Sequence, residues 1–158
     1  MRVSNVNDFS KYISNYDYLV STDGACKGNP GKGTWAFVVY SPNGNTLIGH
    51  KKGSSPNTTN NKMELTAILE ALLWASKHSK RLHIKSDSSY CVKGITEWMN
   101  SWADKNWCGV KNVDLWQQVY NLWGSGSHKI EKVKGHSGDR HNEAADMYCN
   151  EEYMNVFM

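Results

Sequence analysis

Three segments near the start of the chain are rich in β-branched and aromatic side chains, a composition typical of β-strands. They are Tyr16–Thr22, Thr34–Tyr40 and Thr46–Lys52. A glycine-rich stretch separates the first segment from the second, and the turn signal Ser41-Pro42-Asn43-Gly44 precedes the third. Because short turns connect neighbouring antiparallel strands, the pattern predicts an antiparallel meander.

The spacing of the apolar residues changes in the next segment. Apolar side chains recur there at intervals of three and four residues, at Leu65, Ile68, Leu69, Leu72 and Leu73. This period predicts an amphipathic helix from about Thr58 to Lys77. The alternating segment Leu82–Lys85 then predicts a short strand.

The remainder of the chain predicts three helices and one strand: Tyr90–Trp102, Asp114–Trp123 with Gly124 as its cap, Asn142–Tyr153, and the strand Lys129–Val133. The resulting order, β-β-β-α-β-α-α-β-α, predicts an α/β fold in which helices pack on a mixed sheet. The sequence contains no internal repeat, low-complexity tract or linker. We therefore expect one domain over residues 16–158, preceded by a polar N-terminal extension of residues 1–15.

Charge and composition narrow the function classes only slightly. The chain carries 18 lysine and arginine residues against 15 aspartate and glutamate residues, a net charge of +3 that permits a polyanionic partner without requiring one. No stretch approaches the roughly 20 apolar residues of a membrane span, and the N-terminus lacks an apolar signal core, so we expect a cytoplasmic protein. Its four cysteines form no CxxC pair and no zinc spacing, which predicts free thiols.

Four carboxylates, each at the edge of an apolar run, are the candidate chemistry of the chain. They are Asp23 in STDGACKGNPGKG, Glu64 in TTNNKMEL, Asp87 in KSDSSY and Asp146 in GHSGDRHNEAADM. A cluster of like charges is tolerable when a cation neutralises it, and hard divalent cations prefer oxygen ligands. Two such ions side by side can clamp a phosphodiester during cleavage, so the first hypothesis is a metal-dependent nuclease.

Each carboxylate also has an ordinary structural interpretation. Asp23 fits a turn aspartate, Glu64 fits a capping box that starts at Asn61, Asp87 fits a helix N-cap and Asp146 fits a helix-face charge. Spacing alone does not decide whether the four converge.

Three other features leave two interpretations open. The glycine-rich segment Gly28–Gly33 fails both the Walker A and the dinucleotide-binding patterns, so it is a tight turn or a backbone surface for nucleic acid. His136, flanked by glycine, is a proton carrier or a surface histidine. Trp98 and Trp102, four residues apart, pack between helices or stack on a nucleic acid.

Five ordered motifs resemble type 1 ribonuclease H, which cuts the RNA strand of an RNA·DNA hybrid. They are TDGACKGNPGKG, TTNNKMEL, SDSSYCVKGITEW, VKNVDLW and VKGHSG followed by Asn142, Glu143 and Asp146, and they cover about Tyr18 to Met147. The resemblance implies the ribonuclease H-like fold, a five-stranded mixed sheet whose first three strands are antiparallel, with helices on both faces. It also implies a monomer with no obligate protein partner.

The resemblance assigns a role to each candidate residue. Asp23, Glu64, Asp87 and Asp146 are implied to bind two Mg²⁺ ions, with Mn²⁺ as a substitute and Asp23 bridging the pair. His136 is implied to assist proton movement or product release, and Glu143 to have a secondary role. The expected products carry 5′-phosphate and 3′-hydroxyl ends. Implied contacts with the hybrid are Cys26, Gly28, Asn29, Asn60 and Asn61 in the minor groove, Thr59 at a DNA phosphate, and Trp98 and Trp102 in the handle region.

The sequence departs from the family pattern in three places. The handle around Cys108-Gly109 is shorter and less basic than in common bacterial members, which predicts weaker or differently placed hybrid binding. Ser89 stands where relatives often have glutamine, and Asp139-Arg140-His141 differs from the usual loop. Two alternatives stay open: a DNA strand-transfer or junction-resolving nuclease on the same scaffold, and a non-catalytic hybrid-binding module.

Overall fold

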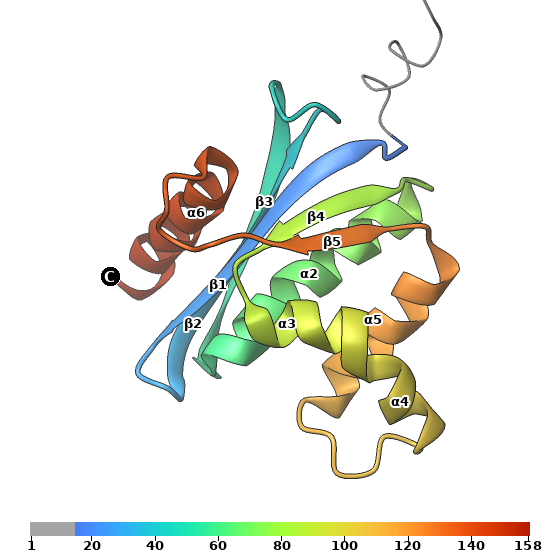
Figure 1. Cartoon of the computed structure of the whole chain (residues 1–158). Coiled ribbons are helices and arrows are strands. Elements are labelled where there is room, and N and C mark those ends of the chain that lie inside the picture. Colours follow the sequence, from blue (N-terminus) through green and yellow to red (C-terminus); the bar gives the residue numbers. More distant parts are fainter. Residues whose placement is uncertain (1–14) are drawn as a thin grey trace, which may run out of the picture.

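A computed structural model of the chain describes residues 15–158, and the predicted N-terminal extension lies outside them except for Asn15. Its first three strands, β1 (Tyr18–Lys27), β2 (Gly31–Tyr40) and β3 (Leu47–Thr58), form an antiparallel meander. Two shorter strands, β4 (Leu82–Ser86) and β5 (Lys129–Lys132), extend the sheet in parallel on the other side of β1. The strand order is β3-β2-β1-β4-β5, which confirms the predicted mixed sheet (Figure 1).

The helices cover both faces of the sheet, as predicted. One face is covered by α6 (Arg140–Phe157), and the other by α2 (Asn60–Lys77), against which α5 (Val113–Ser125) packs (Figure 1). Between β4 and α5 the chain forms one interrupted helical segment: α3 (Ser89–Lys93), a single π-helical turn η1 (Gly94–Trp98) and α4 (Met99–Asp104). None of the helices in residues 15–158 is long and apolar enough to cross a membrane.

Neighbouring residues of β1 show how the sheet is held between its two layers. Successive strand side chains point to opposite faces. Val20 therefore joins the large core beneath α2, whereas Leu19 joins a smaller core with Val38, Tyr40 and Ala145 of α6. Full burial of such an aliphatic side chain stabilises the fold by about 1.5–3 kcal/mol. This two-sided packing keeps β1, which carries Asp23, rigid.

Trp116 of α5 is a core residue. Its side chain is fully buried, its indole N–H donates to the Tyr90 hydroxyl over 2.7 Å, and Trp102 packs edge-on against it. A Cβ at Gly94 would collide with the same indole ring, so glycine lets η1 approach α5 closely. The packing interpretation is confirmed for Trp102, which packs against Trp116 and the core.

Several predicted boundaries were wrong. β1 does not end at Thr22, because Asp23–Lys27 continue to pair with β2, and β3 continues beyond Lys52 to Thr58. The glycine-rich turn is confined to residues 28–30, and Gly31 already belongs to β2. The cap of α5 is Gly126, not Gly124. Pairing with a neighbouring strand, which local composition does not reveal, decided the strand ends.

Candidate active site

Asp23 and Asp87 are brought together by the parallel pairing of β1 with β4. The last paired residues of this ladder are Thr22 and Ser86, and each aspartate follows one of them. Their side chains therefore start from equivalent positions on adjacent strands. Asp23 is buried within β1, whereas Asp87 lies just beyond the end of β4.

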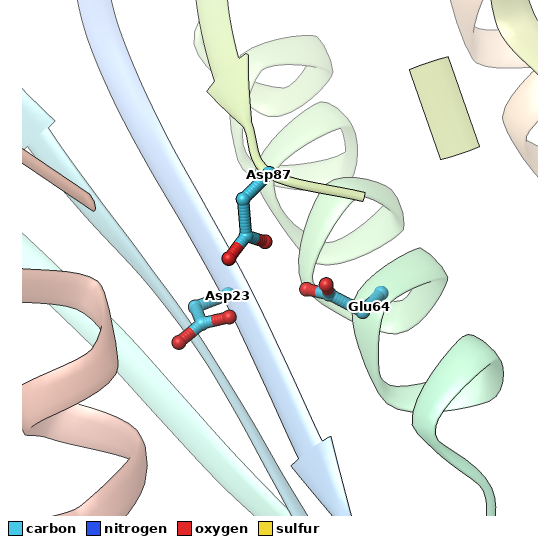
Figure 2. Close-up of side chains that lie close together, drawn as sticks. All are labelled: Asp23, Glu64 and Asp87. Carbon is cyan, nitrogen blue, oxygen red and sulfur yellow. The ribbon is translucent and has the colours of Figure 1, made fainter. Parts of the chain in front are cut away.

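Glu64 reaches the same place from α2. The start of α2 faces Gly24 of β1, and a Cβ at Gly24 would collide with the backbone of Met63 and Glu64. Glycine at this position thus lets α2 pack directly against β1. The three residues each offer a carboxylate oxygen within 4.8 Å of the others' oxygens. Figure 2 shows the carboxylates of Asp87 and Glu64 directed toward the space beside Asp23.

Neither Glu64 nor Asp87 serves as a helix cap. Thr59 is the N-cap of α2, where its hydroxyl accepts from the Lys62 amide over 3.2 Å. Ser88 caps α3 by accepting from the Cys91 amide over 3.1 Å. The capping interpretations of both carboxylates were therefore wrong, and the carboxylates are available for another purpose.

The carboxylate cluster is electrostatically unfavourable without a bound cation. Burial, together with the charges of Asp87 and Asp146, raises the pKa of Asp23 to about 8. Burial, together with the charges of Asp23 and Asp87, also raises the pKa of Glu64. Glu64 Oε1 and Asp87 Oδ1 are buried without a hydrogen-bond partner among the described residues. Unpaired oxygens of buried carboxylates match the donor set that Mg²⁺ and Mn²⁺ prefer.

Asp146 flanks this group from the opposite face of the sheet. It lies on α6, half-buried, and accepts a 3.5 Å hydrogen bond from the Asn150 side-chain amide. Its negative charge contributes to the raised pKa of Asp23, which places it near that residue. The structure thus groups three of the four predicted carboxylates tightly and sets the fourth beside Asp23.

His136 lies in the loop between β5 and α6. It is exposed and adopts a left-handed backbone conformation with φ of 56°. Gly135 passes so close to Asp87 that a Cβ there would lie 2.6 Å from Asp87 Oδ2. The loop therefore starts beside the carboxylates. Glu143, in the first turn of α6, is exposed.

The predicted minor-groove residues meet where the β1–β2 turn touches the start of α2. Asn60 Oδ1 accepts from the Cys26 amide over 2.8 Å, and Asn29 Oδ1 accepts from the Asn60 amide over 3.1 Å. The Cys26 thiol contacts the Gly28 carbonyl over 2.7 Å, and Gly28 has the positive φ of 75° that favours glycine. Thr59, as the N-cap, adjoins this junction, and Asn61 is exposed in the first turn of α2.

Trp98 and Trp102 lie apart from this junction, on η1 and α4. Trp102 is half-buried against Trp116, whereas Trp98 keeps 38% of its surface exposed. The short loop after α4 presents an exposed Cys108, and all four cysteines are free thiols, as predicted.

Two contributors were missed by sequence reasoning. Gly24 was not singled out, although its place one residue after Asp23 in a strand was a signal for close backbone approach. Lys85 was placed in a strand without a role, yet its ammonium group lies 2.6 Å from Asp139 Oδ2. A lysine two residues before a candidate ligand gave no local signal that it would contact a residue 54 positions later.

Comparisons with known proteins agree with this geometry. The ribonuclease H family model matches residues 15–153. A curated protein named Ribonuclease H from Verminephrobacter eiseniae is 48% identical over 139 residues, covering 83% of this chain and 86% of that protein.

Solved structures show the same fold. The crystal structure of LC9-RNase H1, described as a type 1 RNase H with the type 2 active-site motif, matches with a TM-score of 0.77 and 27% identity, over 90% of this chain and 74% of that one. A foamy viral protease-reverse transcriptase solved in complex with an RNA/DNA hybrid matches with a TM-score of 0.76 and 17% identity, over 89% of this chain and 20% of that one. At 17% identity, the second match supports the fold alone.

Proposed function

The chain belongs to the ribonuclease H family, and from this premise we propose that it hydrolyses the RNA strand of RNA·DNA hybrids with two divalent metal ions. The observation that carries the proposal is the convergence of Asp23, Glu64 and Asp87 within 4.8 Å. Curated relatives are named Ribonuclease H, which makes the chain an endoribonuclease by family. The number of metal ions, the residues that bind them and the chemistry of the product ends are what we propose beyond the family assignment.

Asp23, Glu64, Asp87 and Asp146 would hold the metal ions. The donor set fits because it consists of carboxylate oxygens, two of them buried without a partner in the described residues. When bound, two such ions supply an activated water and charge stabilisation for the departing oxygen, which gives 5′-phosphate and 3′-hydroxyl ends. Asp23 would take part in holding both ions, because the charges of Asp87 and Asp146 both act on it.

His136 would carry a proton at the mouth of this cluster. Its ring is exposed on a loop whose preceding glycine abuts Asp87. An exposed imidazole can accept a proton or assist product release without a metal contact of its own. Glu143 lies in the adjoining first helical turn and would have a secondary role.

The junction of the β1–β2 turn with α2 would recognise the hybrid. Asn29 and Asn60 use their Oδ1 atoms within the protein, which leaves their Nδ2 groups as donors. Minor-groove base edges and ribose 2′-hydroxyls offer matching acceptors, and the 2′-hydroxyl distinguishes RNA from DNA. Cys26, Gly28 and Asn61 would complete this surface, Thr59 would meet a DNA phosphate, and Trp98 with Trp102 would contact the strand beyond it.

The test is cleavage of a hybrid labelled on each strand, by the parent chain and an Asp23→Asn variant, with and without Mg²⁺. We expect the parent alone, and only with metal, to cut the RNA strand as a monomer. Cutting of duplex DNA would instead indicate a DNA strand-transfer or junction-resolving nuclease. Tight hybrid binding without cutting in either Mg²⁺ or Mn²⁺ would indicate a non-catalytic binding module.

A further inference from the structure

The loop that carries His136 is anchored to β4 at both of its ends. Before the loop, the Val133 amide donates to the Ser86 carbonyl over 2.9 Å. After the loop, Asp139 Oδ2 accepts from Lys85 Nζ over 2.6 Å. Lys85 and Ser86 are the two residues directly before Asp87. Both ends of the segment 134–138 are therefore held against the end of β4, directly before Asp87.

The second anchor also begins a helix. Asp139 is the N-cap of α6, and its Oδ1 accepts from the amides of His141 and Asn142 over 3.0 Å each. Burial alone would raise the pKa of Asp139, but hydrogen bonds from Lys85 and these amides outweigh it and lower the pKa. One ionised carboxylate thus holds both the first turn of α6 and the Lys85 ammonium group.

His141 ties the same turn to the β2–β3 connection. Its Nδ1 lies 3.1 Å from Lys85 Nζ and its Nε2 lies 2.8 Å from the Gly44 carbonyl. Since the ammonium group can only donate, Nδ1 accepts and the Nε2–H donates. A Cβ at Gly44 would crowd this imidazole, and the Arg140 guanidinium also donates to the Gly44 carbonyl over 2.9 Å. The start of α6 is therefore clamped between β4 and the β2–β3 turn.

We propose that Lys85 is a positioning residue that, through Asp139, fixes the His136 loop and the start of α6 relative to Asp87. The inference rests on the proposed function, because it concerns the geometry of the same site. Lys85 itself makes no contact with the grouped carboxylates in the described hydrogen bonds.

Loss of the Lys85–Asp139 pair affects both stability and position. The two side chains keep only 13% and 22% of their surfaces exposed, so removing Lys85 leaves a largely buried carboxylate without its cation and lowers the global stability. A shift of a proton-carrying group by about 1 Å also lowers the rate by a large factor. The positioning effect should therefore be measured as a loss of turnover at temperatures where the variant remains folded.

The first experiment compares Lys85→Met with the conservative Lys85→Arg, each also combined with His136→Ala. We expect Lys85→Met to lower kcat about tenfold with KM for the hybrid within about twofold, and Lys85→Arg to recover most of the loss. In the His136→Ala background, Lys85→Met should lower kcat by less than about threefold. Equal factors in both backgrounds, or a change confined to KM, would overturn the proposal.

Lys51→Met is the matched control. Lys51 also lies on a strand and pairs with a carboxylate, Glu70 Oε2, over 3.1 Å, but 58% of its side chain is exposed. Its replacement should leave kcat and KM unchanged. A loss of kcat equal to that of Lys85→Met would show a general charge effect and would contradict positioning.

A second experiment does not depend on cleavage. Amide hydrogen exchange at His141, Asn142 and Glu143 should quicken at least about fivefold in Lys85→Met, while α2 amides keep their protection. If the parent cuts no hybrid but exchange responds in this way, the proposed function fails and the anchoring role of Lys85 stands. Unchanged exchange rates at these three amides would contradict the positioning role, whatever the variant's cleavage activity.

Discussion

Asp23 and Asp87 follow directly paired residues of one parallel ladder, Thr22 and Ser86, so their carboxylates leave adjacent strands at the same level. This relationship places two negative charges side by side in a largely buried setting. The fold tolerates that cost because β1 packs against a core on each face of the sheet and β4 contributes Leu82 and Ile84 to the larger core. The arrangement is typical of a site that binds a cation and costs stability without one.

The raised pKa of Asp23 predicts an unusual pH dependence for the metal-free protein. Its pKa rises from 3.8 to about 8 in the folded state, so ionisation favours the unfolded chain. The stability of the metal-free protein should therefore fall as the pH rises from about 4 to about 8. Asp23→Asn should raise the unfolding free energy near the upper end of this window by about 2 kcal/mol, and the gain should vanish at the lower end.

Thermal unfolding in a chelator, repeated with Mg²⁺, measures this effect. Mg²⁺ should raise the melting temperature of the parent more than that of Asp23→Asn. Asp104→Asn, at an exposed position, serves as the control. Equal melting temperatures of parent and Asp23→Asn across the whole pH range would contradict the prediction.

Gly24→Ala should damage the site without touching a carboxylate. The added methyl group would meet the backbone of Met63 and Glu64 and force α2 away from β1. We expect a loss of about 1–3 kcal/mol in unfolding free energy and a large rise in the Mg²⁺ concentration needed for half-maximal cleavage. Gly49→Ala is the matched control, because nothing lies within 4 Å of its Cβ position. Similar behaviour of the two variants would argue against the close approach.

Asn60→Asp should separate recognition from folding. The aspartate retains an acceptor for the Cys26 amide but replaces the Nδ2 donor with a negative oxygen. Binding of the hybrid, measured by fluorescence anisotropy, should weaken by about 10–100-fold, while the melting temperature changes little. Asn60→Ala should weaken binding and also lower the melting temperature. Undiminished hybrid binding by Asn60→Asp would remove Asn60 from the recognition surface.

The two kinds of tryptophan should respond differently to truncation. Trp98→Ala removes a partly exposed ring and should weaken hybrid binding by about 1–3 kcal/mol with little effect on folding. Trp116→Ala removes a fully buried ring and its hydrogen bond to Tyr90, and should cost about 3–5 kcal/mol of stability. Chemical denaturation and hybrid titration distinguish the outcomes. A stability loss for Trp98→Ala as large as that for Trp116→Ala would place Trp98 in the core.

The sequence predicted the fold class because its apolar periods are local and strong. The α2 stripe of Leu65, Ile68 and Leu72 and the β2 run ending at Tyr40 identify their elements without any neighbour. Strand ends were mispredicted where pairing partners, rather than composition, extend a strand, as at Asp23–Lys27. The π-helical turn at Gly94 was also missed, because it coincides with the close approach to Trp116.

The sequence by itself determined which residues are candidates for the chemistry: four carboxylates, a loop histidine and the asparagine-rich turns, each in a motif of a known family. Only the tertiary structure decided that Thr59 and Ser88 cap the helices and so leave Glu64 and Asp87 free to meet Asp23. It also decided that Lys85 reaches across 54 positions to Asp139. The physical reason is that composition and period are local properties, whereas distances between carboxylates depend on strand register and on how closely two backbones approach.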